Sequence, residues 1–96
     1  MSVKVTLNCQ VQDDQFGDLH TFLEDNLSNV RNFKGCHEVS VFFDHVNYEL
    51  ILDETWEDIQ HHRDYILFIT ENNILSQLIS FFKSPPTVKY FNPVNI

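Results

Sequence analysis

The chain has few of the residues that mark fibrous, disulfide-stabilised or nucleic-acid-binding proteins. Two glycines and three prolines among 96 residues are too few for a collagen-like or linker-like chain. Two cysteines, Cys9 and Cys36, make no disulfide framework, and without a Cys-x-x-Cys pair they indicate neither structural zinc nor a redox dithiol. Six scattered basic residues against fourteen acidic ones, a net charge of −8, argue against a nucleic-acid partner.

Long apolar runs are missing as well. The longest, from Tyr65 to Ile69, is far shorter than the roughly 20 residues that a membrane-spanning helix needs. The first residues, Met1 to Val5, lack the apolar core of a signal peptide, and the scattered cations make no polybasic membrane anchor. We therefore expect a cytoplasmic protein that does not bind membranes.

Apolar residues are nevertheless plentiful enough to build a core. They make up 43% of the chain and include nine phenylalanines, so the chain is expected to fold rather than to stay disordered. Ninety-six residues leave room for one such core. Residues 1–96 are therefore predicted to form one domain.

The first third of the chain predicts a strand followed by a helix. Apolar residues alternate over 3–11, which is the period of a strand, and recur at steps of three and four over 16–33, which is the period of a helix. Asp13 and Asp14 are the expected N-cap of this helix because their charges suit the positive end of its dipole. Gly35 is the expected stop.

The remainder of the chain predicts two strands, a helical region and a last strand. The expected elements are strands over 36–43 and 47–55, helices from about 56 to 71 and from 74 to 82, and a strand over 87–91. Asn72 and Asn73 are expected to interrupt the helical region. Pro85 and Pro86 are expected to end it, because proline lacks the backbone donor that a helix needs.

The order βαββαβ predicts an α+β fold, a ferredoxin-like sandwich with one antiparallel sheet and helices on one face. In the usual strand order of this fold, another strand separates the two strands that carry Cys9 and Cys36. The two cysteines are then roughly 10 Å apart, whereas a disulfide bond needs Cα atoms within about 7 Å. Both are therefore expected to be buried free thiols.

The predicted strands carry apolar residues at both parities, as at Val41 and Phe42 or at Leu50 and Ile51. The helices can cover only one face of the sheet, so the other face is expected to leave several hundred Å² of apolar surface in water. At about 25 cal/mol per Å², covering that surface is worth several kcal/mol. We therefore expect a homodimer in which the two sheets pack face to face.

Three short stretches of the sequence, taken together with their order and spacing, carry a resemblance. They are Gly35-Cys36-His37-Glu38-Val39, the Glu54-Thr55-Trp56 end of the third strand, and the run from Pro85 to Phe91. Over about residues 3–92 the chain resembles the antibiotic biosynthesis monooxygenase domain. The resemblance implies a dimeric α+β barrel. It also implies a pocket between sheet and helices, lined by an Asn on the first strand and a Trp at the end of the third, which Asn8 and Trp56 match here.

The family that the chain resembles has mixed functions. Some members oxygenate polycyclic phenols with no metal and no flavin, others bind and degrade haem, and many have no known activity. A His on the second helical region completes the haem-degrading set, but His61 and His62 come too soon after Trp56, and Ile66 holds the position about a turn later. The resemblance therefore implies a monooxygenase that acts without a cofactor on a small aromatic or quinol-type substrate.

Oxygenation without a cofactor needs a proton acceptor for the substrate and donors for the developing anion. His62 lies on the apolar stripe of the second helical region and is the predicted acceptor, because the ordinary pKa of histidine lies near neutrality. Asn8 is predicted to donate to an oxyanion, and Trp56 to stack on the substrate and donate through its indole N–H. His61 and Tyr65 are the predicted substrate-binding residues.

Acidic residues cluster around the end of the third strand. They are Asp53, Glu54, Glu57 and Asp58. A two-carboxylate acid–base pair is one interpretation, and a solvated acidic start of a helix is the simpler one. A metal site from His61 with one of these carboxylates lacks a full ligand set, so no metal is predicted.

Two other functions remain open at this point. One is a dimeric module that binds a small apolar ligand, or responds to it, without catalysis. The other, weaker alternative is haem binding.

Overall fold

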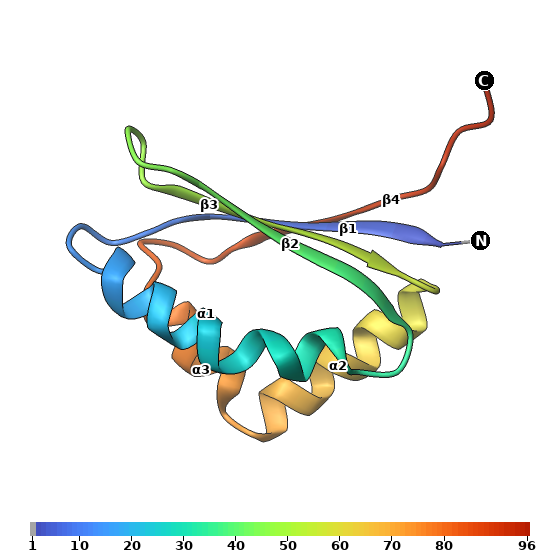
Figure 1. The fold of residues 1–96 in the computed structure, drawn as a ribbon, viewed down its shortest axis with the longest axis horizontal. Coiled ribbons are helices and arrows are strands. Elements are labelled where there is room, and N and C mark those ends of the chain that lie inside the picture. Colours follow the sequence, from blue (N-terminus) through green and yellow to red (C-terminus); the bar gives the residue numbers. More distant parts are fainter. Residues whose placement is uncertain (1) are drawn as a thin grey trace.

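The computed structural model describes residues 2–96 and confirms the α+β class. In chain order the elements are β1 (Val3–Gln10), α1 (Phe16–Arg31), β2 (Cys36–Asp44), β3 (Glu49–Trp56), α2 (Ile59–Glu71), α3 (Ile74–Ile79) and β4 (Thr87–Phe91). The strands form one antiparallel sheet in the order β2-β3-β1-β4. The three helices lie on the same side of this sheet (Figure 1). This is the ferredoxin-like arrangement that the element order predicts.

The strand order keeps the two cysteines apart. β3 lies between β1, which carries Cys9, and β2, which carries Cys36. Both are free thiols, as predicted, but only Cys9 is buried, since Cys36 near the end of the sheet is half-buried. Burial raises the pKa of Cys9 to about 12 and also raises the pKa of the less buried Cys36, so neither is activated as a thiolate.

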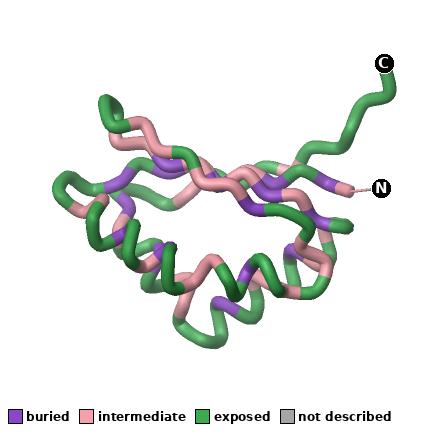
Figure 2. The backbone as a smooth tube through the Cα atoms, viewed as in Figure 1, coloured by how far each residue is buried: buried purple, intermediate pink, exposed green. Residues whose placement is uncertain are grey.

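The core fills the space between the inner face of the sheet and the helices. Along β1 and β3 the register places Val5 opposite Glu54 and Leu7 opposite Leu52 on this face. In Figure 2, buried segments appear on the strands and on the helices that face them. Two clusters of buried residues make the core: Leu7, Cys9, Val11, Leu19, Leu23, Leu50, Leu52, Leu78 and Phe82 form one, and Val3, Val5, Val30, Val39 and Trp56 form the other.

Two helix starts differ from the prediction. α1 is preceded by Gln15 at the N-cap position, where no side chain caps the helix. Asp13 and Asp14 instead form a turn before it, with Asp14 at a φ of 64°. α2 starts three residues later than predicted, at Ile59, because Trp56 still belongs to β3 and the Asp58 side chain is the actual cap.

The end of the helical region also differs. The interruption at Asn72 and Asn73 is confirmed, but α3 stops at Ile79 rather than continuing to Phe82. The backbone around residue 82 turns back to the end of β1, where the N–H of Lys83 donates to the Gln10 carbonyl at 2.8 Å and Phe82 bridges Val11. Among residues 2–96, none of the helices is both long enough and apolar enough to span a membrane.

The outer face of the sheet is less apolar than the sequence led us to expect. Val41 and Leu50 point toward the helices, so the apolar residues of the outer face are Phe42, Ile51 and Phe91. Polar side chains occupy the positions between them. We call this surface the open face, since no element of the described chain covers it.

The two glycines of the chain should differ in how strongly their substitution by alanine changes the stability of the fold. Gly35 has a φ of 89°, and a Cβ built there would lie 2.5 Å from the His61 side chain. Gly35→Ala should therefore destabilise the fold by about 1–3 kcal/mol. Gly17, in α1, has open space around it, so Gly17→Ala should be neutral or stabilise by up to about 1 kcal/mol. Urea unfolding measures both, and equal effects of the two substitutions would contradict this account.

Candidate functional site

A small cavity lies between the inner face of the sheet and the three helices. Its volume is about 60 Å³. The residues around it are mostly apolar, and the polar or ionisable ones are Asn26, Glu54, His62 and Tyr65. An apolar cavity with a few convergent polar groups is the usual form of a small-ligand site. This cavity is therefore the candidate site.

Glu54 brings a carboxyl group into the core. It lies on β3, and strand alternation directs it inward like Leu52 and Trp56, leaving it 6% exposed. Its Oε1 accepts a hydrogen bond from the Trp56 indole N–H at 2.8 Å. Burial raises the pKa of Glu54; the Trp56 hydrogen bond counteracts this in part, and the charge of Asp53 adds to the rise. Glu54 therefore holds its proton to higher pH than an ordinary glutamate.

His62 reaches the same cavity from α2. Its Nδ1 lies 2.8 Å from the Tyr90 hydroxyl, and its Nε2 lies 3.9 Å from Glu54 Oε1, which is too long for a hydrogen bond. Burial, with a further contribution from Arg63, lowers the pKa of His62 to about 4. The imidazole is thus uncharged at neutral pH, and it forms no ion pair with Glu54 despite their proximity.

Trp56 supports these groups from behind the cavity wall. It is completely buried, and its ring centroid lies 5.4 Å from that of His62, 5.5 Å from that of Tyr65 and 6.2 Å from that of Phe33. Its indole N–H is already bonded to Glu54. The structure therefore gives Trp56 the geometry of a residue that orients the Glu54 carboxyl, rather than the predicted geometry of a platform under the substrate.

Asn8 is not part of this arrangement. It pairs with Ile51 on the open face, because it is one residue away from Leu7, which faces the helices. The pocket that the family resemblance implied for Asn8 and Trp56 together is therefore not formed, since the sheet lies between the two side chains. This corrects the expected placement of Asn8.

Of the two residues predicted to bind substrate, one lines the cavity and the other lies outside it. Tyr65 lines the cavity, and burial raises its pKa well above its ordinary value, so it carries a neutral hydroxyl. His61 lies elsewhere, in the first turn of α2, where its side chain is next to Gly35. Adjacent residues of a helix point about 100° apart, so His61 cannot share the direction of His62.

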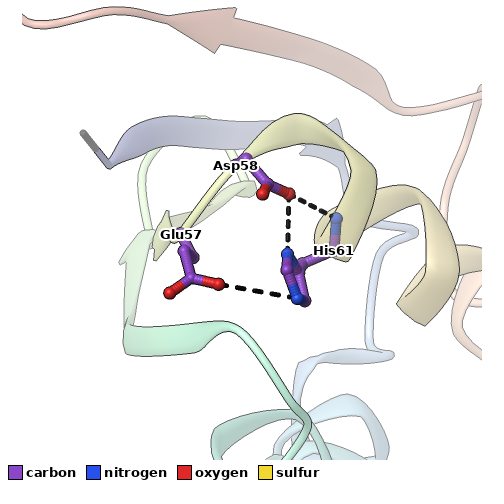
Figure 3. Close-up of side chains that lie close together, drawn as sticks. All are labelled: Glu57, Asp58 and His61. Atoms are coloured by element: carbon purple, nitrogen blue, oxygen red, sulfur yellow. Dashed lines mark hydrogen bonds and ion pairs between the residues drawn. The ribbon is translucent and has the colours of Figure 1, made fainter.

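Glu57, Asp58 and His61 form a cluster at the start of α2 (Figure 3). Asp58 Oδ1 accepts from the backbone N–H of His61 at 2.8 Å and lies 2.7 Å from its Nδ1, and these contacts hold the pKa of Asp58 below its usual value. The His61 Nε2 lies 3.5 Å from Glu57. Helix capping accounts for the cluster, and three groups from one helical turn are fewer than a structural metal site uses.

The carboxyl groups at the end of β3 therefore divide into two kinds. Glu57 and Asp58 are exposed and belong to the acidic helix start that the sequence indicated. Glu54 does not belong to it, because the strand continues to Trp56 and directs Glu54 inward. The interpretation of all these acids as a solvated helix start was wrong for Glu54.

No family model matches the chain, and no curated protein matches it in sequence. Solved structures match over nearly its whole length. The protein Rv0793 from Mycobacterium tuberculosis superposes with a TM-score of 0.84 at 18% identity, over 100% of this chain and 98% of that one. A protein named antibiotic biosynthesis monooxygenase superposes with a TM-score of 0.85 at 13% identity, over 97% and 99%. The monooxygenase of the Streptomyces coelicolor gene ActVA-Orf6, in complex with nanaomycin D, gives 0.77 at 14% identity, over 99% and 89%.

The fold is that of the antibiotic biosynthesis monooxygenases. The resemblance inferred from the sequence is therefore confirmed for the backbone. At such low identity the likeness concerns the fold alone, and any chemistry depends on the side chains of this chain.

Two residues of the site, Glu54 and Tyr90, were not among the predicted site residues. The alternation of Leu50, Leu52, Glu54 and Trp56 already indicates that Glu54 points inward, and this signal outweighs the local acidic composition. Tyr90 is different, because it meets His62 from 28 residues further along the chain. Its contact depends on the pairing of β4 with β1 in this monooxygenase fold, which no local pattern specifies.

The buried imidazole predicts a loss of stability in mild acid. The folded pKa of His62, about 4, lies below its ordinary 6.5, so the unfolded chain binds the proton first as pH falls from 6.5 to 4. Above pH 6.5, neutral His62 makes its full contribution to the free energy of unfolding. About 3 kcal/mol of that contribution is lost as pH falls from 6.5 to 4. His62→Asn should make the pH dependence of unfolding free energy shallower by about that amount.

Urea unfolding between pH 4 and 7 measures the difference. The raised pKa of Glu54 has the opposite effect, because its contribution to the free energy of unfolding is present at low pH and is lost as pH rises. This contribution is common to the unmodified protein and to His62→Asn. His20→Asn is the matched control, because His20 is exposed on α1, where its Nδ1 lies 2.8 Å from Glu24. An unchanged slope in His62→Asn would contradict the assignment of a neutral buried imidazole.

Proposed function

We propose that the chain is a cofactor-independent monooxygenase that oxidises a small aromatic or quinol-type substrate in the cavity between sheet and helices. The observation that carries this proposal is a mostly apolar cavity whose wall holds a buried carboxyl, Glu54, close to a neutral imidazole, His62. Such a buried pair can move protons and stabilise a developing anion. The fold shared with proteins named monooxygenases supports the same type of reaction.

The reaction balances without an added reductant. A phenol with a free ortho carbon loses its O–H proton, and the resulting phenolate supplies electrons to dioxygen. One oxygen atom becomes bonded to the ortho carbon and the other leaves as water, so the phenol and dioxygen give an ortho-quinone and water. The protein has to accept and return protons, hold the ring and keep bulk water out of the site.

The cavity favours a small and flat substrate. Its volume of about 60 Å³ is well below the roughly 150 Å³ of an apolar cavity that holds benzene, so a single ring enters only if the aliphatic side chains of the lining, such as Leu27, Leu52 and Ile69, move apart. The Streptomyces coelicolor monooxygenase holds the ligand nanaomycin D, which supports small-molecule binding by this fold.

A non-catalytic ligand-binding module is the second candidate. It is favoured by one observation: two of the predicted catalytic groups do not reach the cavity, since Asn8 lies on the open face and the Trp56 N–H is engaged by Glu54. For such a module, ligands raise the unfolding temperature without oxygen uptake. Haem binding, the third alternative, is distinguished by a Soret shift on titration with haem.

A second copy of the chain is the proposed partner. The open face carries Phe42 and Phe91, which are 56% and 49% exposed, and apolar side chains gathered on one exposed face mark interaction sites. Ile51 lies beside Phe42 in the register and extends this apolar surface. Packing two open faces together covers these side chains and leaves both cavities on the outer, helical sides.

The first prediction of this proposal concerns turnover. The purified protein, without added flavin or metal, should consume oxygen with hydroquinone faster than buffer does. Trp56→Phe removes the donor to Glu54, and His62→Ala removes the imidazole, so each should lower the rate at least 10-fold, as for groups that take part in proton transfer. An oxygen electrode measures the rate, and His20→Ala is the control. Unchanged rates in both site variants would contradict the site assignment.

The second prediction concerns assembly. Sedimentation at micromolar concentration should give twice the chain mass of 11.4 kDa. Phe42→Glu should shift the protein to the monomer, because it places a charge in the proposed interface. Leu67→Glu is the matched control, since Leu67 is 58% exposed but lies on α2, away from the open face. A monomeric unmodified chain, or equal effects of the two substitutions, would overturn this interface.

A further inference from the structure

Glu54 occupies a position where a glutamate is costly. Its neighbours across the sheet are Val5 on β1 and Val39 on β2, and both are buried. Transfer of a carboxyl group into such surroundings costs several kcal/mol unless hydrogen bonds or an opposite charge offset it. Among the described residues, no Lys or Arg forms an ion pair with Glu54, and His62 is uncharged. Structural pairing therefore does not explain why a carboxyl group is here.

The carboxyl group is nevertheless held in a defined position. The Trp56 indole donates to its Oε1 at 2.8 Å, and Trp56 itself is fixed by complete burial. Glu54 also lines the cavity, so it is within reach of a bound ligand. A positioned acid at the wall of an apolar cavity has the geometry of a group that exchanges protons with a ligand.

His62 is less suited to that task. Its Nδ1 is engaged with the Tyr90 hydroxyl, and accepting a proton on Nε2 would create an imidazolium ion in the core. Burial opposes that charge, which is why its pKa is low. A general base works best when its pKa lies near the working pH, and burial moves Glu54 toward neutrality and His62 away from it.

We propose that Glu54 is the catalytic residue that takes the proton from a phenolic substrate and returns it to the reduced oxygen, with Trp56 and His62 as its positioning residues. This inference rests on the proposed function. It replaces His62 as the proton acceptor and adds a residue that the sequence had assigned to a solvated helix start.

The proton steps balance with Glu54 alone. Its carboxylate accepts the phenol O–H proton, and the O–H electron pair stays on the substrate. The ortho carbon then bonds to dioxygen, and Glu54 protonates the terminal oxygen to give a hydroperoxide. The carboxylate next removes the hydrogen of that carbon as a proton while the O–O bond breaks. The leaving hydroxide takes this proton from Glu54 and departs as water, which restores the carboxylate.

The surroundings of Glu54 set the pH range of this step. The titratable side chains around Glu54 are Asp53 on the same strand, Cys36 on β2, and His62 and Tyr65 on α2. Tyr90 on β4 is connected to Glu54 through its contact with His62. Arg31 of α1 donates to the backbone carbonyl of Val39, the cross-strand partner of Glu54. Asp53 points to the open face, 3.0 Å from Lys4, and its charge raises the pKa of Glu54. Removal of that charge should lower the pKa without touching the cavity.

The same charges restrict the substrate. No lysine or arginine is found among the residues that line the cavity, and ionised Glu54 repels a second carboxylate. The substrate class is therefore a neutral one-ring phenol. Hydroquinone and 2,5-dihydroxybenzoate form a matched pair of probes, because they differ by a single carboxylate.

The first experiment needs no substrate. Trp56 is the only tryptophan of the chain, and its indole is bonded to Glu54, so its fluorescence reports the ionisation of this carboxyl. The emission should titrate with a midpoint above the ordinary glutamate range in the unmodified protein. This transition should vanish in Glu54→Gln, whose amide oxygen still accepts from the indole. Asp53→Asn should shift the midpoint to lower pH. A titration unchanged by Glu54→Gln would overturn the proposal.

The second experiment follows oxygen uptake with hydroquinone against pH. Glu54→Gln should lower kcat by about 100-fold or more and abolish the rise of rate with pH. His62→Asn, which keeps a hydrogen-bonding group near Nδ1, should be slower but retain that rise. Asp53→Asn should retain kcat and move the rise to lower pH. Loss of the rise in His62→Asn, with its retention in Glu54→Gln, would restore His62 as the acceptor and overturn the proposal.

The two experiments separate failure of this inference from failure of the proposed function. Oxygen uptake that is insensitive to Glu54→Gln contradicts only the role of Glu54. Absence of uptake with hydroquinone and with 2,5-dihydroxybenzoate contradicts the monooxygenase itself, and the fluorescence titration then still decides whether Glu54 is a titrating group of the cavity. Faster turnover of 2,5-dihydroxybenzoate than of hydroquinone would contradict the neutral substrate class. Circular dichroism checks that each variant is folded.

Discussion

The two-residue period of the strands is the constraint on which the site depends. Successive side chains of a strand point to opposite faces, and the helices cover only one face of this sheet. Glu54 therefore enters the core while its neighbour Asp53 stays outside, although both are acids of similar size. By the same rule Asn8 is directed away from the cavity. A shift of one residue in the register would exchange the two faces and replace the site with a different set of groups.

Burial acts on the two titratable groups of the cavity wall in opposite directions. It disfavours charge of either sign, so it raises the pKa of Glu54 and lowers the pKa of His62. Burial thus shifts both groups toward their uncharged forms, which cost the core less than a buried ion pair would. Each group has one aromatic hydrogen-bonding partner, Trp56 for the carboxyl and Tyr90 for the imidazole. The core thus keeps groups that can exchange protons while it remains stable.

The similarity to solved structures separates fold from chemistry. Identities of 13% to 18% accompany TM-scores of 0.77 to 0.85 in the three superpositions described above. A fold can be kept at such identities because it depends on the pattern of buried and exposed positions, which many sequences satisfy. A catalytic site depends instead on particular atoms at particular distances. In this chain the proposed site depends on atoms of Glu54, Trp56 and His62.

The sequence alone was enough to determine the order of the elements, because hydrophobic period is a local property. The strand over 87–91 and the interruption at Asn72 and Asn73 match the structure. The separation of the cysteines follows from the strand order that is usual for this order of elements, and it matches the structure as well. Tertiary structure decided the rest. The early end of α3 results from the return of the chain to β1, and the contact between His62 and Tyr90 results from the pairing of β4 with β1. The burial of Glu54 needed both, because strand parity directs it inward but only packed helices exclude water from it.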